Sequence, residues 1–301
     1  MFDVVNDLIV CEQLNEKNYL IEYDNNNKCA IYFSSHGVYF PETKENFKRT
    51  ILDKNYYEWY NTRIPGYHKH IFMRDITKQF CVEGISNELN SIDRIALFLK
   101  KETEGYKVTT VGSSAGGYVA VIIGLLLKVD KVFCYSGKFS LKDDFAYRTK
   151  QKLLVHENDI NYSKYYNVSH LIAKNRSTPI YYVFPKDVQE DIVQKNIIVD
   201  APNFILYPFS GKKHGVCMYP FNLPIFMAKE HGEFLELASC LKGNVTKGIS
   251  RIYFSNILIG KKRTLKNIVV LYYKKIVKRV FKKKLKYGNY VGKMNFEGKI
   301  Q

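Results

Sequence analysis

The residues best suited to chemistry lie between Thr109 and Leu127, in the stretch TTVGSSAGGYVAVIIGLLL. A Walker-type phosphate loop needs a lysine after its last glycine, and a dinucleotide-binding loop needs G-x-G-x-x-G; neither pattern occurs in this stretch. What remains is G-x-S-x-G, formed by Gly112, Ser114 and Gly116. It stands between a strand-like run and a helix-like run, the context in which a sharp turn lifts a serine nucleophile out of a sheet. Ser114 is therefore the predicted nucleophile, and a glycine-rich helix start is the alternative.

Two acids and a histidine follow Ser114 in the order that such a nucleophile requires. Asp187 and Asp191 come after the strand-like run PIYYVFP, and His214 comes after NFILYPF. A serine hydroxyl needs a base to accept its proton, and an imidazole base needs a carboxylate that fixes its tautomer and stabilises its charged form. We therefore predict that His214 is the base and that one of the two aspartates is its partner. The carboxyl ends of parallel strands would bring the three loops together.

The elements that must position these residues alternate along the chain. The strand-like runs are YLIEY, CAIYFSS, HIFMR, KVTTVG, KVFCYSG, PIYYVFP and NFILYPF. Helix-like runs cover residues 87–101, 115–127 and 224–241. This alternation predicts an α/β fold with a mostly parallel central sheet flanked by helices. Residues 142–177, rich in Asp, Asn, Tyr and Lys, interrupt the pattern and are expected to form a cap-like excursion.

The composition excludes several classes of protein. The 301 residues are 46% hydrophobic, which is enough for a large core. The N-terminal run MFDVVNDLIV lacks the cationic start of a signal peptide, and no run reaches the roughly 18 uncharged apolar residues of a membrane span, so we expect a cytoplasmic protein. The six cysteines form no C-x-x-C pair and are interpreted as reduced thiols. Neither a metal site nor a cofactor is expected.

The positive charge is concentrated at the C-terminus. The formal net charge is +17, and residues 242–301 contain seventeen Lys and Arg against one Glu, so the remainder is nearly neutral. This segment predicts a basic amphipathic helix with apolar positions at Leu265, Val269, Tyr272, Ile276 and Val280, and a basic flank at Lys274, Lys275, Lys278, Arg279 and Lys282. Two alternatives stay open: the helix packs on the rest of the protein, or it lies on an anionic membrane surface. Nucleic-acid binding is not expected, because the neutral remainder has no second basic patch.

The chain resembles an α/β-hydrolase over about residues 18–242. The residues that carry the resemblance are the serine turn VGSSAGGY, the acid loop after PIYYVFP and the histidine loop KKHG, in that order. More narrowly, three features are similar to hydrolase-like proteins of bacterial capsule or surface-glycan biosynthesis and of accessory secretion. They are the strand end IYFSSHG, the pair Trp59-Tyr60 and the Asp-x-x-Gln pattern from Asp191 to Gln194.

The resemblance implies roles for further residues. The oxyanion hole would use the backbone N–H of Ala115, directly after the nucleophile, and that of Ser35 or a neighbour in the loop FSSHG. Asp187 lies at the usual offset beyond its strand and is slightly favoured as the acid. Asp191 fits the narrower pattern but is also suited to cap the next helix.

The resemblance also implies a function, and the change in composition beyond Gly243 predicts the domain organisation. Residues 1–243 would form the catalytic domain and residues 244–301 the basic tail. The expected activity is that of a serine esterase or acyltransferase acting on a bacterial surface glycan or its precursor, with the tail holding the enzyme at the inner face of the cell membrane. The alternative is a catalytically silent hydrolase-fold scaffold recruited to a glycan-assembly or export complex.

Overall fold

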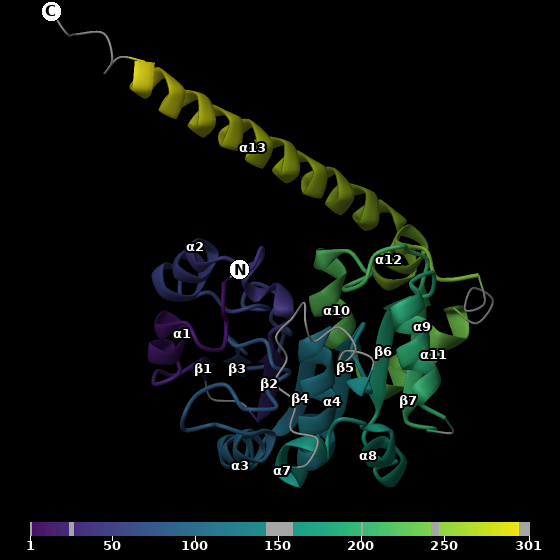
Figure 1. The fold of residues 1–301 in the computed structure, drawn as a ribbon. Coiled ribbons are helices and arrows are strands. Elements are labelled where there is room, and N and C mark those ends of the chain that lie inside the picture. The colour runs from purple at the N-terminus through teal and green to yellow at the C-terminus, as the bar shows by residue number, and fades with distance from the viewer. Residues whose placement is uncertain (1, 24–26, 143–158, 200, 242–246, 295–301) are drawn as a thin grey trace, which may run out of the picture. The chain divides into compact units, whose positions relative to one another are not determined.

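A seven-stranded sheet forms the centre of the first of the two units of the chain (Figure 1). The structure is a computed structural model that describes residues 2–23, 27–142, 159–199, 201–241 and 247–294. Side chains are described as far as residue 277. The strand order is β1-β3-β2-β4-β5-β6-β7. Strand β1 pairs with β3 in antiparallel orientation, and all other neighbouring pairs are parallel. The strands are β1 (Tyr19–Glu22), β2 (Lys28–Phe33), β3 (Lys69–Met73), β4 (Lys107–Ser113), β5 (Lys131–Tyr135), β6 (Ile180–Pro185) and β7 (Phe204–Phe209). The predicted α/β fold is confirmed.

The central strands are buried on both faces, as expected for a parallel sheet covered by helices. Every residue of β3, β5 and β6 is buried, whereas β1 at the edge of the sheet is only partly buried. This burial explains why the central strands are almost continuous runs of β-branched and aromatic residues.

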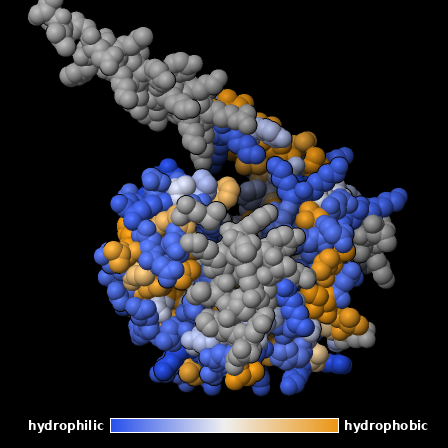
Figure 2. Space-filling model, in the orientation of Figure 1, coloured by the Kyte–Doolittle hydropathy of each residue, from blue (hydrophilic) through white to orange (hydrophobic). Residues whose placement is uncertain are grey.

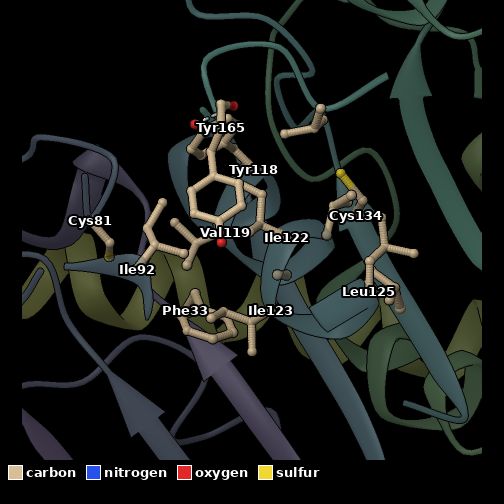
Figure 3. Close-up of a cluster of buried hydrophobic side chains, with 14 of the residues drawn as sticks. Phe33, Cys81, Ile92, Tyr118, Val119, Ile122, Ile123, Leu125, Cys134 and Tyr165 are labelled. Atoms are coloured by element: carbon tan, nitrogen blue, oxygen red, sulfur yellow. Dashed lines mark hydrogen bonds between the residues drawn. The ribbon is translucent and has the colours of Figure 1, made fainter. Parts of the chain in front are cut away.

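Helices α3 (Ile92–Glu102) and α4 (Ala115–Leu127) cover one face of the sheet (Figure 1). Helix α4 is buried at all but its last positions, which accounts for its uniformly apolar sequence. Figure 3 shows its side chains packed around Phe33 of β2 and Cys134 of β5. The helix that follows Ser114 is therefore fixed in the main core.

Helices α10 (Leu223–Met227) and α11 (His231–Leu241) cover the opposite face through aromatic contacts. The ring of Phe133 on β5 lies 5.6 Å from that of Phe226 and 5.8 Å from that of Phe234, measured between centroids. Tyr181 on β6 lies 4.0 Å from Phe234. Because side chains alternate along a strand, Phe133 and its neighbour Cys134 point to opposite faces of the sheet and pack in different hydrophobic cores.

The expected excursion at residues 142–177 is described in part, since residues 143–158 lie outside the described ranges. The described part contains α7 (Ile160–Ser163) and α8 (Ser169–Lys174). It packs on α4, where the Tyr118 hydroxyl donates to the carbonyl of Tyr165 at 2.8 Å. The other helices in the described part of this unit are α1 (Leu8–Gln13), η1 (His36–Tyr39), α2 (Lys44–Phe47), η2 (Lys48–Asp53), α9 (Gln189–Ile197) and η3 (Pro220–Asn222).

The chain divides into residues 1–251 and a second unit of residues 252–301. The expected boundary at residue 243 falls within residues 242–246, outside the described ranges, and Ile249 still pairs with Phe209 of the sheet. Helix α12 (Arg251–Ile259) spans the division, and α13 (Lys261–Met294) follows it. Among the described helices, none has a hydrophobic stretch suited to crossing a membrane.

Candidate active site

Ser114 lies on the turn between the end of β4 and the start of α4. Its backbone has φ 54° and ψ −120°, an unusual conformation for a residue with a side chain. The N–H of Ser114 donates to the carbonyl of Tyr135 on β5 at 2.9 Å, and α4 begins at Ala115. The buried strand and helix on either side hold this strained conformation and present the serine side chain at the carboxyl edge of the sheet.

The two glycines of the motif are required because backbones approach closely at this turn. A Cβ on Gly112 would lie 2.0 Å from the carbonyl oxygen of Gly116. A Cβ on Gly116 would lie 2.4 Å from the carbonyl oxygen of Phe33 and 2.7 Å from that of Ser34. These contacts are with backbone atoms, which cannot rotate away. Gly116 therefore allows the serine turn to pack against the end of β2, where the predicted oxyanion loop begins.

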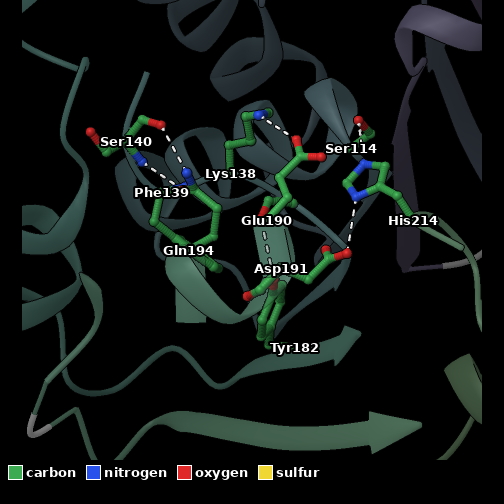
Figure 4. Close-up of polar contacts among 10 residues, drawn as sticks. Ser114, Lys138, Phe139, Ser140, Tyr182, Glu190, Asp191, Gln194 and His214 are labelled. Carbon is green, nitrogen blue, oxygen red and sulfur yellow. Dashed lines mark hydrogen bonds and ion pairs between the residues drawn. The ribbon is translucent and has the colours of Figure 1, made fainter. Parts of the chain in front are cut away.

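A chain of two hydrogen bonds links Ser114 to a histidine and an aspartate (Figure 4). The Oγ of Ser114 lies 2.9 Å from Nε2 of His214, and Nδ1 of His214 lies 3.1 Å from Oδ2 of Asp191. The Asp191 side chain is 1% exposed and the His214 side chain 29% exposed. The structure thus brings together the predicted serine, the predicted histidine and one of the two predicted aspartates.

Asp187, the slightly favoured acid, does not contact His214. Its exposed carboxylate accepts hydrogen bonds from Lys186 Nζ at 2.7 Å and from the N–H of Gly211 at 3.2 Å. Asp191 makes the contact because it lies in the first turn of α9, with its carboxylate directed at the imidazole of His214 (Figure 4). The preference for Asp187 is therefore corrected. Distance along the chain from the strand does not reveal where the helix begins.

The surroundings of His214 favour its charged form. Burial lowers the pKa of His214, but the hydrogen bond and the negative charge of Asp191 outweigh burial, so its pKa is raised above the ordinary value. The charge of Glu190 acts in the same direction, and Lys138 opposes it. Glu190 and Lys138 form an ion pair of 2.6 Å, so their effects on His214 partly cancel.

Of the two N–H groups expected to form the oxyanion hole, that of Ser35 is already hydrogen-bonded within the protein. Ala115 is the first residue of α4, so its backbone N–H is among those that a helix leaves without an internal acceptor. The N–H of Ser35 donates to Oε2 of Glu58 at 2.5 Å, and the Ser35 hydroxyl donates to Oε1 of the same carboxylate at 2.9 Å. Burial raises the pKa of Glu58, against the lowering effect of the Ser35 hydrogen bonds. In this conformation a carboxylate holds the N–H predicted to face a substrate oxygen.

Sequence reasoning missed Glu58, because no spacing rule connects it to the loop at residue 35. The only nearby signal was its neighbour Trp59. The Trp59 indole N–H donates to the carbonyl of Phe33 at 3.2 Å, and its ring lies 5.6 Å from that of Tyr135. The Trp59 loop is thus attached to the same two strand ends that flank the serine turn.

His36, one residue after Ser35, has a buried Nε2 that forms no hydrogen bond within the described part of the chain. Its ring packs edge-on against Phe80 at 4.5 Å. Burial lowers the pKa of His36 to about 3, so the imidazole is neutral near pH 7. Elsewhere in the described residues, no cluster of three or more His, Cys, Asp or Glu side chains is arranged to hold a metal ion.

The tail residues are placed by the structure only in part. Leu265, Val269 and Tyr272 on α13 are exposed, as are the neighbouring Lys274 and Lys275. The predicted basic residues Lys278, Arg279 and Lys282 belong to α13, but their side chains lie outside the described part. Figure 2 shows hydrophobic and hydrophilic surface side by side on the coloured portion of this segment.

The mostly parallel sheet, the serine on a strand-to-helix turn and the order serine, aspartate, histidine define the fold of the α/β-hydrolase superfamily. Searches against protein-family models and curated protein sequences gave no match. Several solved structures are similar to this chain in fold.

The capsule O-acetyltransferase of Neisseria meningitidis serogroup A is 16% identical, covers 73% of this chain and 91% of its own, and has a TM-score of 0.45. The α/β hydrolase MGS-MChE2, from the metagenome of lagoon sediments at Mar Chica, Morocco, is also 16% identical, with 75% and 94% covered and a TM-score of 0.37. MenH from Staphylococcus aureus is 12% identical, with 76% and 99% covered and a TM-score of 0.39. Likeness at this level concerns the fold and carries no inference about function.

Proposed function

We propose that this protein is a serine-dependent enzyme that hydrolyses esters or transfers acyl groups. The observation that carries the proposal is the continuous pair of hydrogen bonds from Ser114 through His214 to Asp191, with Ser114 on a strained turn. A buried carboxylate, an imidazole and a serine in this order are the parts that nucleophilic acyl transfer requires.

The proposed reaction proceeds through an ester of Ser114. Its Oγ attacks the substrate carbonyl carbon while Nε2 of His214 accepts the hydroxyl proton, and Asp191 stabilises the imidazolium. The oxyanion that forms is stabilised by the N–H of Ala115 at the start of α4. Collapse of this intermediate expels the alcohol, which takes the proton from His214. A water or a sugar hydroxyl then attacks the acyl-enzyme by the same steps in reverse, restoring free Ser114.

We further propose that the substrate is a bacterial surface glycan or its precursor. This part of the proposal is supported by the similarity of IYFSSHG, Trp59-Tyr60 and the Asp191-to-Gln194 pattern to hydrolase-like proteins of surface-glycan biosynthesis. The partial exposure of the His214 side chain is compatible with this part, because an acceptor hydroxyl must reach Nε2 of this residue.

Hydrolysis of p-nitrophenyl acetate, with and without an added capsule polysaccharide, tests the proposal. We expect the wild type to release p-nitrophenol and the Ser114→Ala variant to lose this activity. Ser113→Ala is the matched control, because Ser113 is the last residue of β4 and makes no contact with His214 that the structure describes. Faster release with acetate appearing on the polysaccharide would identify a transferase. Release to water alone would identify an esterase.

One observation favours the silent scaffold as a second candidate. The Glu58 carboxylate occupies the Ser35 N–H that the oxyanion hole was expected to use, and a negative charge at that place disfavours an oxyanion. A folded wild type that neither turns over the ester nor reacts at Ser114 would support the scaffold and overturn the enzyme.

We also propose that the basic tail binds an anionic membrane surface. Helix α13 exposes Leu265, Val269 and Tyr272 together with basic residues, the combination found in helices that lie in a membrane interface. Each basic residue near anionic headgroups contributes about 1 kcal/mol.

Co-sedimentation with vesicles tests the tail proposal. We expect binding to vesicles containing phosphatidylglycerol but not to phosphatidylcholine alone, and weaker binding in the Lys274→Glu/Lys275→Glu variant. Lys212→Glu/Lys213→Glu is the charge-matched control, because it changes another exposed pair of lysines by the same amount. Equal binding by the two double variants would contradict the proposal.

A further inference from the structure

The side chain of Gln194 joins helix α9 to the loop that follows β5 (Figure 4). Its Oε1 accepts hydrogen bonds from the N–H of Phe139 at 2.6 Å and from that of Ser140 at 3.0 Å, and its Nε2 donates to the carbonyl of Ser140 at 3.3 Å. Gln194 is 2% exposed. An amide that satisfies three backbone groups away from water fixes the distance between the two segments, because breaking the contact leaves those groups unpaired.

Gln194 lies three residues after Asp191, on the same face of α9. Two weaker contacts hold the same region, since the Tyr182 hydroxyl lies 3.4 Å from the carbonyl oxygens of both Asp191 and Gly137. The ion pair of Lys138 with Glu190 joins the loop and the helix a second time. The loop after β5 therefore holds α9 on both sides of the aspartate.

This attachment compensates for a weakness at the start of α9. A helix begins with N–H groups that lack internal acceptors, and a capping side chain usually satisfies one of them. The residue at the capping position is Val188, whose side chain forms no capping hydrogen bond. Asp191 lies in this first turn, so without other contacts the carboxylate that faces His214 would belong to the part of the helix most prone to fray.

We propose that Gln194 is a positioning residue that holds Asp191 within hydrogen-bonding distance of His214 by tying α9 to the backbone at residues 139 and 140. Gln194 itself touches neither His214 nor Ser114 in the contacts described, and it acts through the placement of Asp191. The placement of Asp191 by Gln194 does not depend on whether the protein is an enzyme, whereas the effect of Gln194 on catalysis rests on the proposed function.

An NMR titration of the His214 imidazole tests the proposal without requiring enzyme activity. The charged groups that face His214 are Asp191 and Glu190 on α9 and Lys138 on the loop after β5. We expect the pKa of His214 to shift downward in Gln194→Ala, because Asp191 then spends less time beside the ring. Gln189→Ala is the matched control, since Gln189 is an exposed glutamine on the same helix, and it should leave the titration unchanged. The His214→Ala variant identifies the resonance.

Two further variants separate positioning from loss of structure. Gln194→Glu keeps an acceptor for both backbone N–H groups, so the pKa of His214 should not fall below the wild-type value. Gln194→Met keeps the volume of the buried site without the hydrogen bonds, and it should lower the pKa of His214 even if the alanine variant does not fold. A titration of Gln194→Met identical to that of the wild type, or a fall in Gln194→Glu as large as that in Gln194→Met, would overturn the proposal.

The rate of Ser114 labelling by a fluorophosphonate is measured in parallel. We expect a loss of roughly tenfold to hundredfold in Gln194→Met, the cost of a small misplacement in a catalytic array. A shifted titration in a protein whose wild type is never labelled would support the positioning role and contradict the proposed function. Labelling of the wild type together with an unshifted titration in Gln194→Met would support the proposed function and contradict the positioning role.

Discussion

The Asp191 carboxylate lies 3.1 Å from the imidazole of His214, although the two residues are 23 positions apart, Asp191 in helix α9 and His214 in the loop after β7. Asp191 is almost completely buried, whereas the imidazole reaches solvent at its edge. The first turn of α9 thus supplies a buried carboxylate, and the imidazole it contacts stays accessible from solvent.

The first prediction distinguishes the two candidate acids. Asp191→Asn should reduce kcat of ester hydrolysis by roughly 10³–10⁴-fold, because the amide no longer stabilises the imidazolium or the correct tautomer. Asp187→Asn should change kcat by less than about twofold, because the Asp187 carboxylate is exposed and bonded to Lys186 and Gly211. Steady-state kinetics of both variants provide the measurement. A large loss in Asp187→Asn would restore the original preference.

The second prediction concerns pH. His214 must be deprotonated to accept the serine proton, so kcat/KM should rise with pH and reach half its plateau at the apparent pKa of His214. Asp191 raises that pKa, so the midpoint should lie above the ordinary value for a histidine. In Asp191→Asn the midpoint should move to lower pH while the plateau falls. A midpoint that does not move would show that another group controls the profile.

The third prediction concerns the glycine that allows the serine turn. Gly116→Ala should lower the free energy of unfolding by roughly 1–3 kcal/mol and abolish serine labelling, because the added Cβ would meet the backbone oxygen of Phe33 at 2.4 Å. Gly232→Ala is the control. A Cβ there has no neighbour within 4 Å, and alanine in helix α11 should stabilise the protein by about 0.5–1 kcal/mol. Denaturant unfolding of both variants measures the difference.

The fourth prediction concerns Glu58, whose carboxylate accepts a hydrogen bond from the N–H of Ser35 in the predicted oxyanion loop. Glu58→Gln removes a negative charge next to the N–H of Ser35 while its amide oxygen can still accept that hydrogen bond. Acylation of Ser114 should therefore become faster by roughly fivefold, about 1 kcal/mol of electrostatic repulsion relieved at the transition state. Stopped-flow measurement of the p-nitrophenol burst checks this. A slower burst would instead show that the Glu58 carboxylate is needed to hold the loop that contains Ser35 in place.

Much of the framework could be predicted from the sequence because the physical signals are local. Runs such as KVFCYSG are buried on both faces, so their composition alone indicates central strands. Gly112 approaches Gly116 within one turn, so the spacing of Gly112, Ser114 and Gly116 indicates the turn, although Gly116 also meets the end of β2. The position of His214 after the last strand followed from the same reasoning.

The rest depends on contacts between distant segments. The choice of Asp191 over Asp187 depends on where α9 begins and on the loop that Gln194 holds, and neither is encoded by the distance from β6. The contact of Glu58 with Ser35 joins two loops that share no periodic pattern. Such contacts are decided by tertiary packing, which a single sequence does not display.

Whether Ser114 is a nucleophile is tested by intact-mass analysis after reaction with a fluorophosphonate, which reacts with activated serines. Wild type, Ser114→Ala, Ser113→Ala and His214→Ala are compared at equal concentration, with circular dichroism to show that each is folded. We expect one adduct per wild-type or Ser113→Ala chain, none on Ser114→Ala and a strongly reduced rate on His214→Ala. A folded wild type without an adduct, or an adduct that persists in Ser114→Ala, would show that Ser114 is not the nucleophile.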